Sequence, residues 1–350
     1  MSSISTTDAR GLFTKALLAK YQDFPETTSF LRNMFTDRIE MTKEINIEVQ
    51  RGDENIAVGV QRGSIGNRNQ WTQSTEKIFI PEYHREYFDA TELSLYDRLF
   101  GSTSIDDGVF TAFVEQVAFK QRELVKKIER KYEKMCSDVL MTGIVTYDQG
   151  TIIDYKRKAA SNVDPGAGNY WATGTVDPYA DLASGCEFIR TDGQIDISTV
   201  DVIMGKTALQ HFLNNDIVKA RADIRNYMLD SIKSPNRSTA GAAYHGTVTA
   251  GSYNVNIWTY PQYYRPVGGG AKLPYIDDKK IVITPQQPDF VMAYGAVPQL
   301  ATLGGGVRKG KFLFDNYVDE RNASHDFDVK SAGLPVPVGV DQIYTVQVVA

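Results

Sequence analysis

Apolar residues recur at three- and four-residue steps through one long segment, residues 106–143. Only Gln121 interrupts the stripe, Asp106 and Asp107 can cap a helix start, and Gly143 can end it. One helix of this length would measure roughly 50 Å, so it is either part of a coiled coil or a strut, which is a single long helix across which strands are laid. The strand-like flanks favour the strut, with a buried face formed by Phe110, Phe113, Val117, Leu124, Ile128, Tyr132, Met135 and Val139.

Alternating patterns before this helix predict a long hairpin. Residues 44–49 alternate as a strand, and residues 77–88 can form its return partner. A hairpin with so long a tip is marginally stable alone, so we expect the tip to contact a partner surface such as another copy of the chain. The tip residues best suited to an interface are Arg51, Arg62, Arg68 and Trp71. The alternative is a solvated functional or disordered loop.

Turn signals and short strands follow the long helix over residues 144–182, and a second folding unit is expected to begin near residue 183. Helices are predicted over 183–192 and 206–230, and strands over 199–204, 242–249, 253–260 and 280–284. The last two strands are expected to form a hairpin that carries a triple glycine at 268–270. The final ten residues predict a strand that returns to the sheet near the long helix. The predicted fold class is α+β.

Composition narrows the classes of protein. The 350 residues carry a formal charge of -5 with mixed signs, which argues against sequence-reading nucleic-acid binding as the main activity. No apolar run approaches the ~18 residues of a membrane span. The N-terminus lacks the pattern of a secretory signal, so we expect folding in a cytoplasm. Cys136 and Cys186 are expected to be small buried apolar groups and not a disulfide.

Motifs for chemistry are weak. The histidines at 84, 211, 245 and 325 have no metal-ligand spacing, and no metal or cofactor is expected. Asp277 and Asp278 are adjacent, which does not make an acid–base pair. Residues 305–311 satisfy the GxxxxGK part of a phosphate-binding loop, but Phe312 replaces the required Ser or Thr and no helix pattern follows. We therefore expect no catalytic site.

The order of the predicted pieces resembles that of the major capsid proteins of tailed bacteriophages with the Hong Kong 97-type fold. More narrowly, the chain resembles the lambda-like major capsid protein E family. The resemblance is carried by IPEYHREY, VDPYADLASGCEFI, DVIMGKTALQHFL, YNVNIWTYPQYYRPVGGGAKLPYIDDKKIVITP and SAGLPVPVGVDQIYTVQVVA. It spans nearly the whole chain, although each motif by itself is a soft pattern of strands and turns.

The resemblance implies a structural subunit with five regions. These are an N-terminal arm (1–42), an extended loop (43–89), a peripheral domain with the spine helix (90–182), an axial domain (183–320) and a C-terminal return to the peripheral domain (321–350). Pentamers and hexamers of such subunits close an icosahedral virion shell around double-stranded DNA in the host cytoplasm. Expected partners are further copies, a portal and a separate scaffolding protein, and whether a decoration protein binds stays open.

Two alternatives stay open at this point. The first is an encapsulin-like nanocompartment shell protein, which has the same fold and encloses a cargo enzyme. The second is a carbohydrate-active enzyme, for which Tyr263, Tyr264, Tyr275, Asp277 and Asp278 form the cluster to test.

Overall fold

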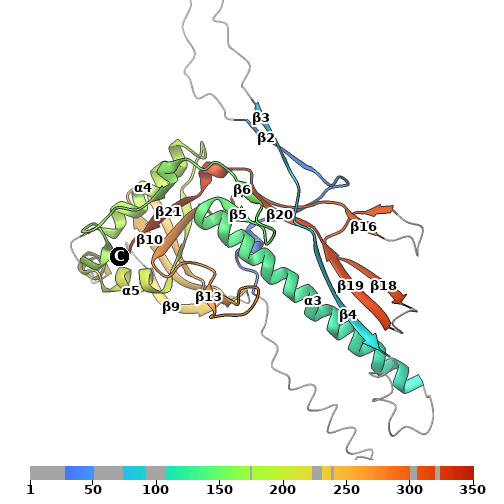
Figure 1. The fold of residues 1–350 in the computed structure, drawn as a ribbon. Coiled ribbons are helices and arrows are strands. Elements are labelled where there is room, and N and C mark those ends of the chain that lie inside the picture. The colour runs from blue at the N-terminus through green and yellow to red at the C-terminus, as the bar shows by residue number, and fades with distance from the viewer. Residues whose placement is uncertain are drawn as a thin grey trace, which may run out of the picture.

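The computed structural model describes residues 28–50, 74–91, 107–173, 176–222, 231–237, 240–299, 306–319 and 324–350. The predicted tip residues Arg51, Arg62, Arg68 and Trp71 lie outside these ranges. The described chain is elongated, with a broad sheet and several helices at one end and a long helix with a narrow sheet reaching away from it (Figure 1). The fold class is α+β, as predicted.

Seven strands form the broad sheet, in the order β7–β21–β14–β8–β11–β10–β9. Their bounds are Asn162–Val163, Tyr344–Gln347, Lys280–Pro285, Thr199–Met204, Tyr253–Thr259, Ala243–Ala250 and Ser231–Arg237, in that order. Alternate residues of these strands, such as Val200, Val202 and Ile283, pack against the helices α4 (Pro178–Thr191), α5 (Lys206–Asn214) and α6 (Asp216–Ala222). The sheet therefore has one face that is covered by helices, as the period of two along each strand requires.

The long helix α3 (Asp107–Thr142) has the bounds that its apolar period predicts to within one residue. Its C-terminal half is enclosed, because Ile128, Tyr132, Met135 and Val139 are each no more than 2% exposed. Val117 is half-buried. The helix packs on two three-stranded sheets, β1–β15–β20 and β18–β19–β4. Their bounds are Thr36–Ile39, Phe290–Tyr294, Gly333–Pro337, Leu313–Asp319, Ser324–Ser331 and His84–Thr91.

The end of α3 is tied to the broad sheet by a half-buried cation. Gly143 closes the helix with φ +71°, and its N–H donates to the Val139 carbonyl at 2.9 Å. The Arg157 guanidinium donates to the Leu140 carbonyl at 3.0 Å and to the Ile343 carbonyl at 3.1 Å. Burial lowers the pKa of Arg157 to about 10. Helix and sheet thus share one hydrogen-bonding side chain.

The extended loop starts from strands β2 (Ile45–Gln50) and β3 (Ser74–Phe79), which pair in antiparallel fashion. The prediction of one return strand over 77–88 is wrong, because β3 ends at Phe79 and β4 begins at His84, where it pairs with β19 instead. Pro81 lies at the break and has no N–H to donate to a ladder. The two halves of the predicted strand therefore belong to different sheets.

Two predicted helices have other bounds in the structure, because polar side chains cap new helix starts. The helix expected from 183 starts at Pro178, because the Asp177 side chain caps it and proline is favoured in a first turn. The helix expected over 206–230 is broken after Asn214, because the Asn215 side chain accepts a hydrogen bond from the Ile217 N–H at 3.0 Å and starts α6.

Strand order corrects the predicted hairpin over 253–284. Strand β8 lies between β11 and β14, so these two strands are not hairpin partners. The connection between them carries the small pair β12 (Tyr263–Tyr264) and β13 (Leu273–Pro274). The final strand β21 pairs with β14, and its Thr345 hydroxyl donates to the Leu140 carbonyl of α3 at 3.1 Å.

The remaining elements are short. Two hairpins pair β5 with β6 and β16 with β17, and four single turns of 3-10 helix complete the described chain. Their bounds are Ile144–Thr146, Ile152–Asp154, Val297–Gln299 and Gly306–Arg308 for the strands, and Arg32–Met34 (η1), Ala159–Ser161 (η2), Trp171–Thr173 (η3) and Val340–Gln342 (η5) for the turns. The segment that mimics a phosphate-binding loop runs from β17 into β18, so no helix follows it.

Candidate functional site

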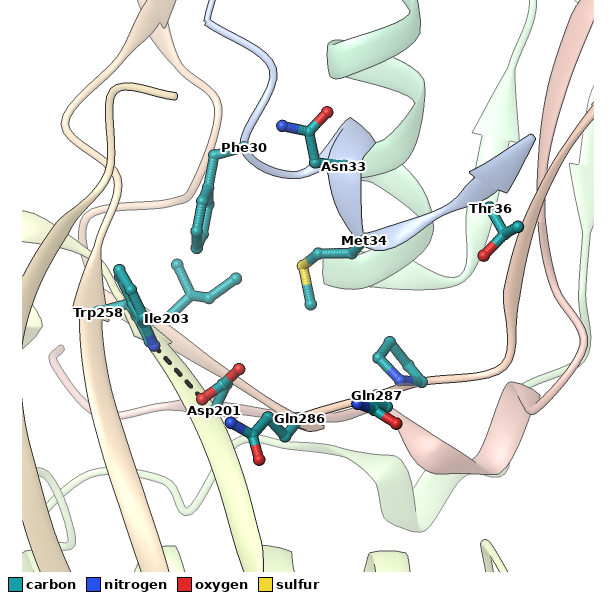
Figure 2. A pocket seen from close by; sticks show the side chains of 10 residues that line it. Phe30, Asn33, Met34, Thr36, Asp201, Ile203, Trp258, Gln286 and Gln287 are labelled. Carbon is teal, nitrogen blue, oxygen red and sulfur yellow. Dashed lines mark hydrogen bonds between the residues drawn. The ribbon is translucent and has the colours of Figure 1, made fainter. Parts of the chain in front are cut away.

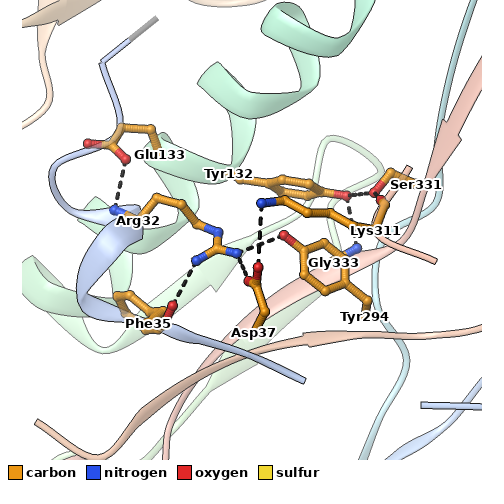
Figure 3. Close-up of polar contacts among 9 residues, drawn as sticks. All are labelled: Arg32, Phe35, Asp37, Tyr132, Glu133, Tyr294, Lys311, Ser331 and Gly333. Carbon is orange, nitrogen blue, oxygen red and sulfur yellow. Dashed lines mark hydrogen bonds and ion pairs between the residues drawn. The ribbon is translucent and has the colours of Figure 1, made fainter. Parts of the chain in front are cut away.

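The N-terminal segment is anchored on α3 by one buried carboxylate. Glu133 is fully buried, and its two oxygens accept hydrogen bonds from the Leu31 N–H and the Arg32 N–H, each at 2.9 Å. Figure 3 shows the bond to Arg32. These amides open η1, where a helix has N–H groups without an internal partner. Glu133 therefore supplies from another element the cap that the turn itself lacks.

The environment of Glu133 changes its acidity. Burial raises the pKa of this carboxyl to about 7, against the hydrogen bonds from Tyr260 and the two amides, which lower it. Because desolvation disfavours the charged form, the anchor takes up a proton near neutral pH.

Arg32 extends the anchor to the neighbouring sheet β1–β15–β20. Its guanidinium donates to the Phe35 carbonyl at 2.8 Å and to the Tyr294 hydroxyl of β15 at 2.9 Å, and it forms an ion pair with Asp37 of β1. Asp37 also lies 3.5 Å from the Lys311 ammonium (Figure 3). The chain thus enters the body of the protein through a fixed turn whose direction is set by charge-assisted bonds.

A second polar contact joins α3 to the C-terminal strands. The Tyr132 hydroxyl donates to the Ser331 hydroxyl at 2.6 Å and accepts from the Gly333 N–H at 3.0 Å. Burial raises the pKa of Tyr132, so the phenol stays neutral. A Cβ at position 333 would lie 2.9 Å from the Tyr132 ring, which is too close, so glycine is the residue that fits there.

The base of the extended loop has its own contact with α3. Glu82 accepts from the Asp148 N–H at 3.0 Å, and the Lys131 ammonium lies 2.6 Å from the Asp148 carboxylate and 3.6 Å from Glu82. Burial, with a further effect of Lys131, lowers the pKa of His84 to about 4, while Asp148 opposes this shift. His84 is therefore neutral at physiological pH. Through Lys131, α3 connects the base of the loop to the β5–β6 hairpin.

The tyrosine and aspartate cluster considered for an enzyme is organised as a turn. The Asp277 carboxylate accepts from the Lys279 N–H at 3.0 Å. Tyr275 is buried and packs on the rings of Tyr260 and Tyr264 at 5.8 and 5.2 Å. Among the described residues, no group of three metal-binding side chains was found. The Asp277 carboxylate thus has a structural hydrogen bond, and the Tyr275 ring has a structural packing role.

Comparison with known proteins identifies the family. The model of the family "Phage major capsid protein E" matches residues 13–348. The chain belongs to this capsid protein family. A search of curated protein sequences found no match.

Solved structures share the fold of this capsid protein at low identity. A protein assigned as the capsid protein of an E. coli CFT073 prophage superposes with a TM-score of 0.64 at 15% identity, over 98% of this chain and 99% of that chain. The capsid of cyanophage P-SCSP1u gives 0.51 at 8% identity, over 93% and 89%. The mature capsid of bacteriophage PhiM1 gives 0.51 at 11% identity, over 93% and 88%. The Hong Kong 97-type capsid fold is therefore confirmed.

The predicted site residues of the capsid protein fall into three groups. The tip residues, and the side chains of Phe110 and Phe113, lie outside the part of the chain that the structure describes. Val117 and Leu124 are half-buried, whereas the α3 residues from Ile128 to Val139 line the main core with Leu334 and Val336 of β20. Sequence reasoning missed Glu133, because a glutamate next to an apolar stripe usually faces water. The stretch MCSDVLM that follows it at 135–141 has no basic residue, and this absence indicates a helix end enclosed on several sides. Within the described residues, no helix is long and apolar enough to cross a membrane.

Proposed function

We propose that this chain is the shell subunit of a tailed bacteriophage, assembling as pentamers and hexamers into an icosahedral capsid around double-stranded DNA. Membership of the capsid protein family over residues 13–348 carries this proposal. The elongated shape supports it, because an extended subunit offers more surface to neighbours than a compact one (Figure 1). A net charge of -5 suits a wall that encloses DNA without binding its sequence.

The five regions expected from the resemblance become roles in this proposal. Residues 1–42 act as an arm, 43–89 as the extended loop, 90–182 as the peripheral domain, 183–320 as the axial domain and 321–350 as the C-terminal return. Strands β19 and β20 run beside α3 and β21 joins the broad sheet, so the return connects both domains. Assembly takes place in the host cytoplasm with a scaffolding protein, a portal and, where the phage has one, a decoration protein.

Electron microscopy of the full-length protein, expressed with its neighbouring genes, tests this function. Closed shells with five-fold and six-fold capsomers are expected. A protein that stays monomeric beside its scaffold would contradict the proposal. Shells that enclose a cargo enzyme and no portal would favour a nanocompartment instead.

The loop tip is proposed as a contact between copies. Replacing Trp71 or Arg68 by alanine is expected to leave the unfolding midpoint of the subunit unchanged while the yield of shells falls. Gln149→Ala, in the exposed turn between β5 and β6, is the control and keeps the wild-type yield. An unchanged shell yield in both tip variants argues against an interfacial tip.

A further inference from the structure

A pocket of about 500 Å³ opens on the face of the seven-stranded sheet opposite α4, α5 and α6. Phe30 and Met34 of the N-terminal segment form one wall, and Asp201, Ile203 and Trp258 of β8 and β11 form the floor (Figure 2). The Phe30 and Trp258 rings lie 5.5 Å apart. Half of the lining residues are apolar, and the other half are Asn33, Thr36, Gln286, Gln287 and Asp201, which is the single acidic side chain among them.

That carboxylate has neutral partners only. Asp201 accepts hydrogen bonds from the Asn256 amide at 2.9 Å and from the Trp258 indole N–H at 3.3 Å. Burial raises its pKa, and in the described part of the chain no basic side chain pairs with it. A carboxylate that has lost water without gaining a cation is costly, so a basic group that enters the pocket would be stabilised.

The chain carries a segment of complementary chemistry. Residues 9–22, ARGLFTKALLAKYQ, contain three basic residues and no acidic residue. Large apolar side chains, Leu12, Phe13, Leu17 and Leu18, stand between the basic ones. One basic group with apolar neighbours complements Asp201 and the apolar half of the lining, which is Phe30, Met34, Ile203, Trp258 and Pro288.

The described chain begins at the rim of this pocket. The Thr28 hydroxyl lies 2.6 Å from the Tyr260 hydroxyl, two residues before Phe30 of the pocket wall. Lys20 precedes Thr28 by eight residues, which span up to about 27 Å when extended. A tether this short gives an effective concentration in the millimolar range, so it favours the subunit's own segment over one from another copy.

We propose that residues 9–22 of the subunit's own N-terminal arm bind this pocket, with a lysine of the segment directed at Asp201. Under the proposed function, the docked arm keeps its apolar side chains away from neighbouring copies until a shell forms. The pocket is then an internal binding site that competes with contacts between subunits.

Cross-linking of the full-length subunit tests the docking directly. Leu17→Cys is combined with Gln287→Cys at the rim, and a short bismaleimide is added to dilute protein; Cys136 and Cys186 are buried and do not compete. A link between 17 and 287 within one chain is expected by mass spectrometry. The matched control combines Leu17→Cys with Gln149→Cys, another exposed glutamine, in the β5–β6 turn, and should give a much lower yield.

The charge is tested in the same background. Asp201→Asn keeps the oxygen that Asn256 and Trp258 bind and removes the charge, so the fold is retained and the yield should fall about fivefold, which corresponds to ~1 kcal/mol. Asp196→Asn, at an exposed position, should leave the yield unchanged. Equal yields for the two cysteine pairs, or no effect of Asp201→Asn, would overturn the proposal. Cross-linked dimers in place of the internal link would assign the pocket to a second copy.

Shell formation is scored separately by electron microscopy. Shells that form from subunits without the internal link contradict this inference alone. A normal internal link without shells contradicts the proposed function alone.

Discussion

Gly333→Ala probes the tightest packing between α3 and the C-terminal strands. A Cβ at this position would lie 2.8 Å from the Met292 methyl, 2.9 Å from the Tyr132 ring and 3.0 Å from the Tyr294 ring. The two rings cannot move freely, because Tyr132 is hydrogen-bonded to Ser331 and Tyr294 to Arg32. Overpacking a core usually costs ~1–3 kcal/mol, and two restrained rings place this substitution near 2–3 kcal/mol.

Chemical denaturation of the isolated subunit, followed by tryptophan fluorescence, measures this cost. Gly306→Ala is the matched control, since Gly306 also lies in a strand and has nothing within 4 Å of its Cβ position. Its unfolding free energy should change by less than ~0.5 kcal/mol. Adding Met292→Ala to Gly333→Ala should relieve part of the clash. The double variant should therefore lose ~1 kcal/mol less unfolding free energy than the sum of the losses in the two single variants. Equal midpoints for Gly333→Ala and Gly306→Ala would refute the argument.

Three further predictions concern the core of α3. Arg157→Met removes the hydrogen bonds to the Leu140 and Ile343 carbonyls, of which Leu140 keeps the Thr345 hydroxyl as a donor, and should lower the unfolding free energy by ~2–4 kcal/mol. Lys156→Met, at an exposed side chain, should change little in the same denaturation assay. Glu133 has a folded-state pKa of about 7 against an ordinary value of 4.5, so the folded state holds the proton more tightly than the unfolded state. The unfolding free energy should therefore fall by about 3 kcal/mol as the pH rises from 4 to 8, and Glu133→Gln should show a flatter dependence of unfolding free energy on pH. Ile128→Asp puts a charge at a site that is 2% exposed and should abolish soluble folded protein, whereas Phe119→Asp, at a 37% exposed site on the same helix, should not; equal soluble yields would show that the stripe is not buried.

The sequence predicts those parts of this fold that follow from a repeating pattern. The apolar period of α3 and the alternation in β8 and β10 depend on regular geometry, so their bounds come within one or two residues of the observed ones. The pairing of strands depends on contacts between distant segments. A period of two is the same for β4 beside β19 as for β4 beside β2, and the sequence could not decide between them.

The anchor at Glu133 was outside the reach of sequence reasoning for a similar reason. A glutamate in a helix becomes a cap for another turn only because η1 lies across the helix at that level, and no local pattern encodes this crossing. The same holds for Asp201, whose neighbours Asn256 and Trp258 come from a strand more than fifty residues away in the sequence.

The break at Pro81 has a consequence for how the molecule can vary. Strand β3 belongs to the extended loop and β4 to the sheet beside α3, and Glu82, directly after the proline, fixes the boundary between them. Insertions or foreign peptides placed beyond β2 and β3 therefore do not change the register of the strands that pack on α3. The loop sequence can therefore change, in evolution or in particles engineered to display antigens, without changes to the strands and helix that hold it.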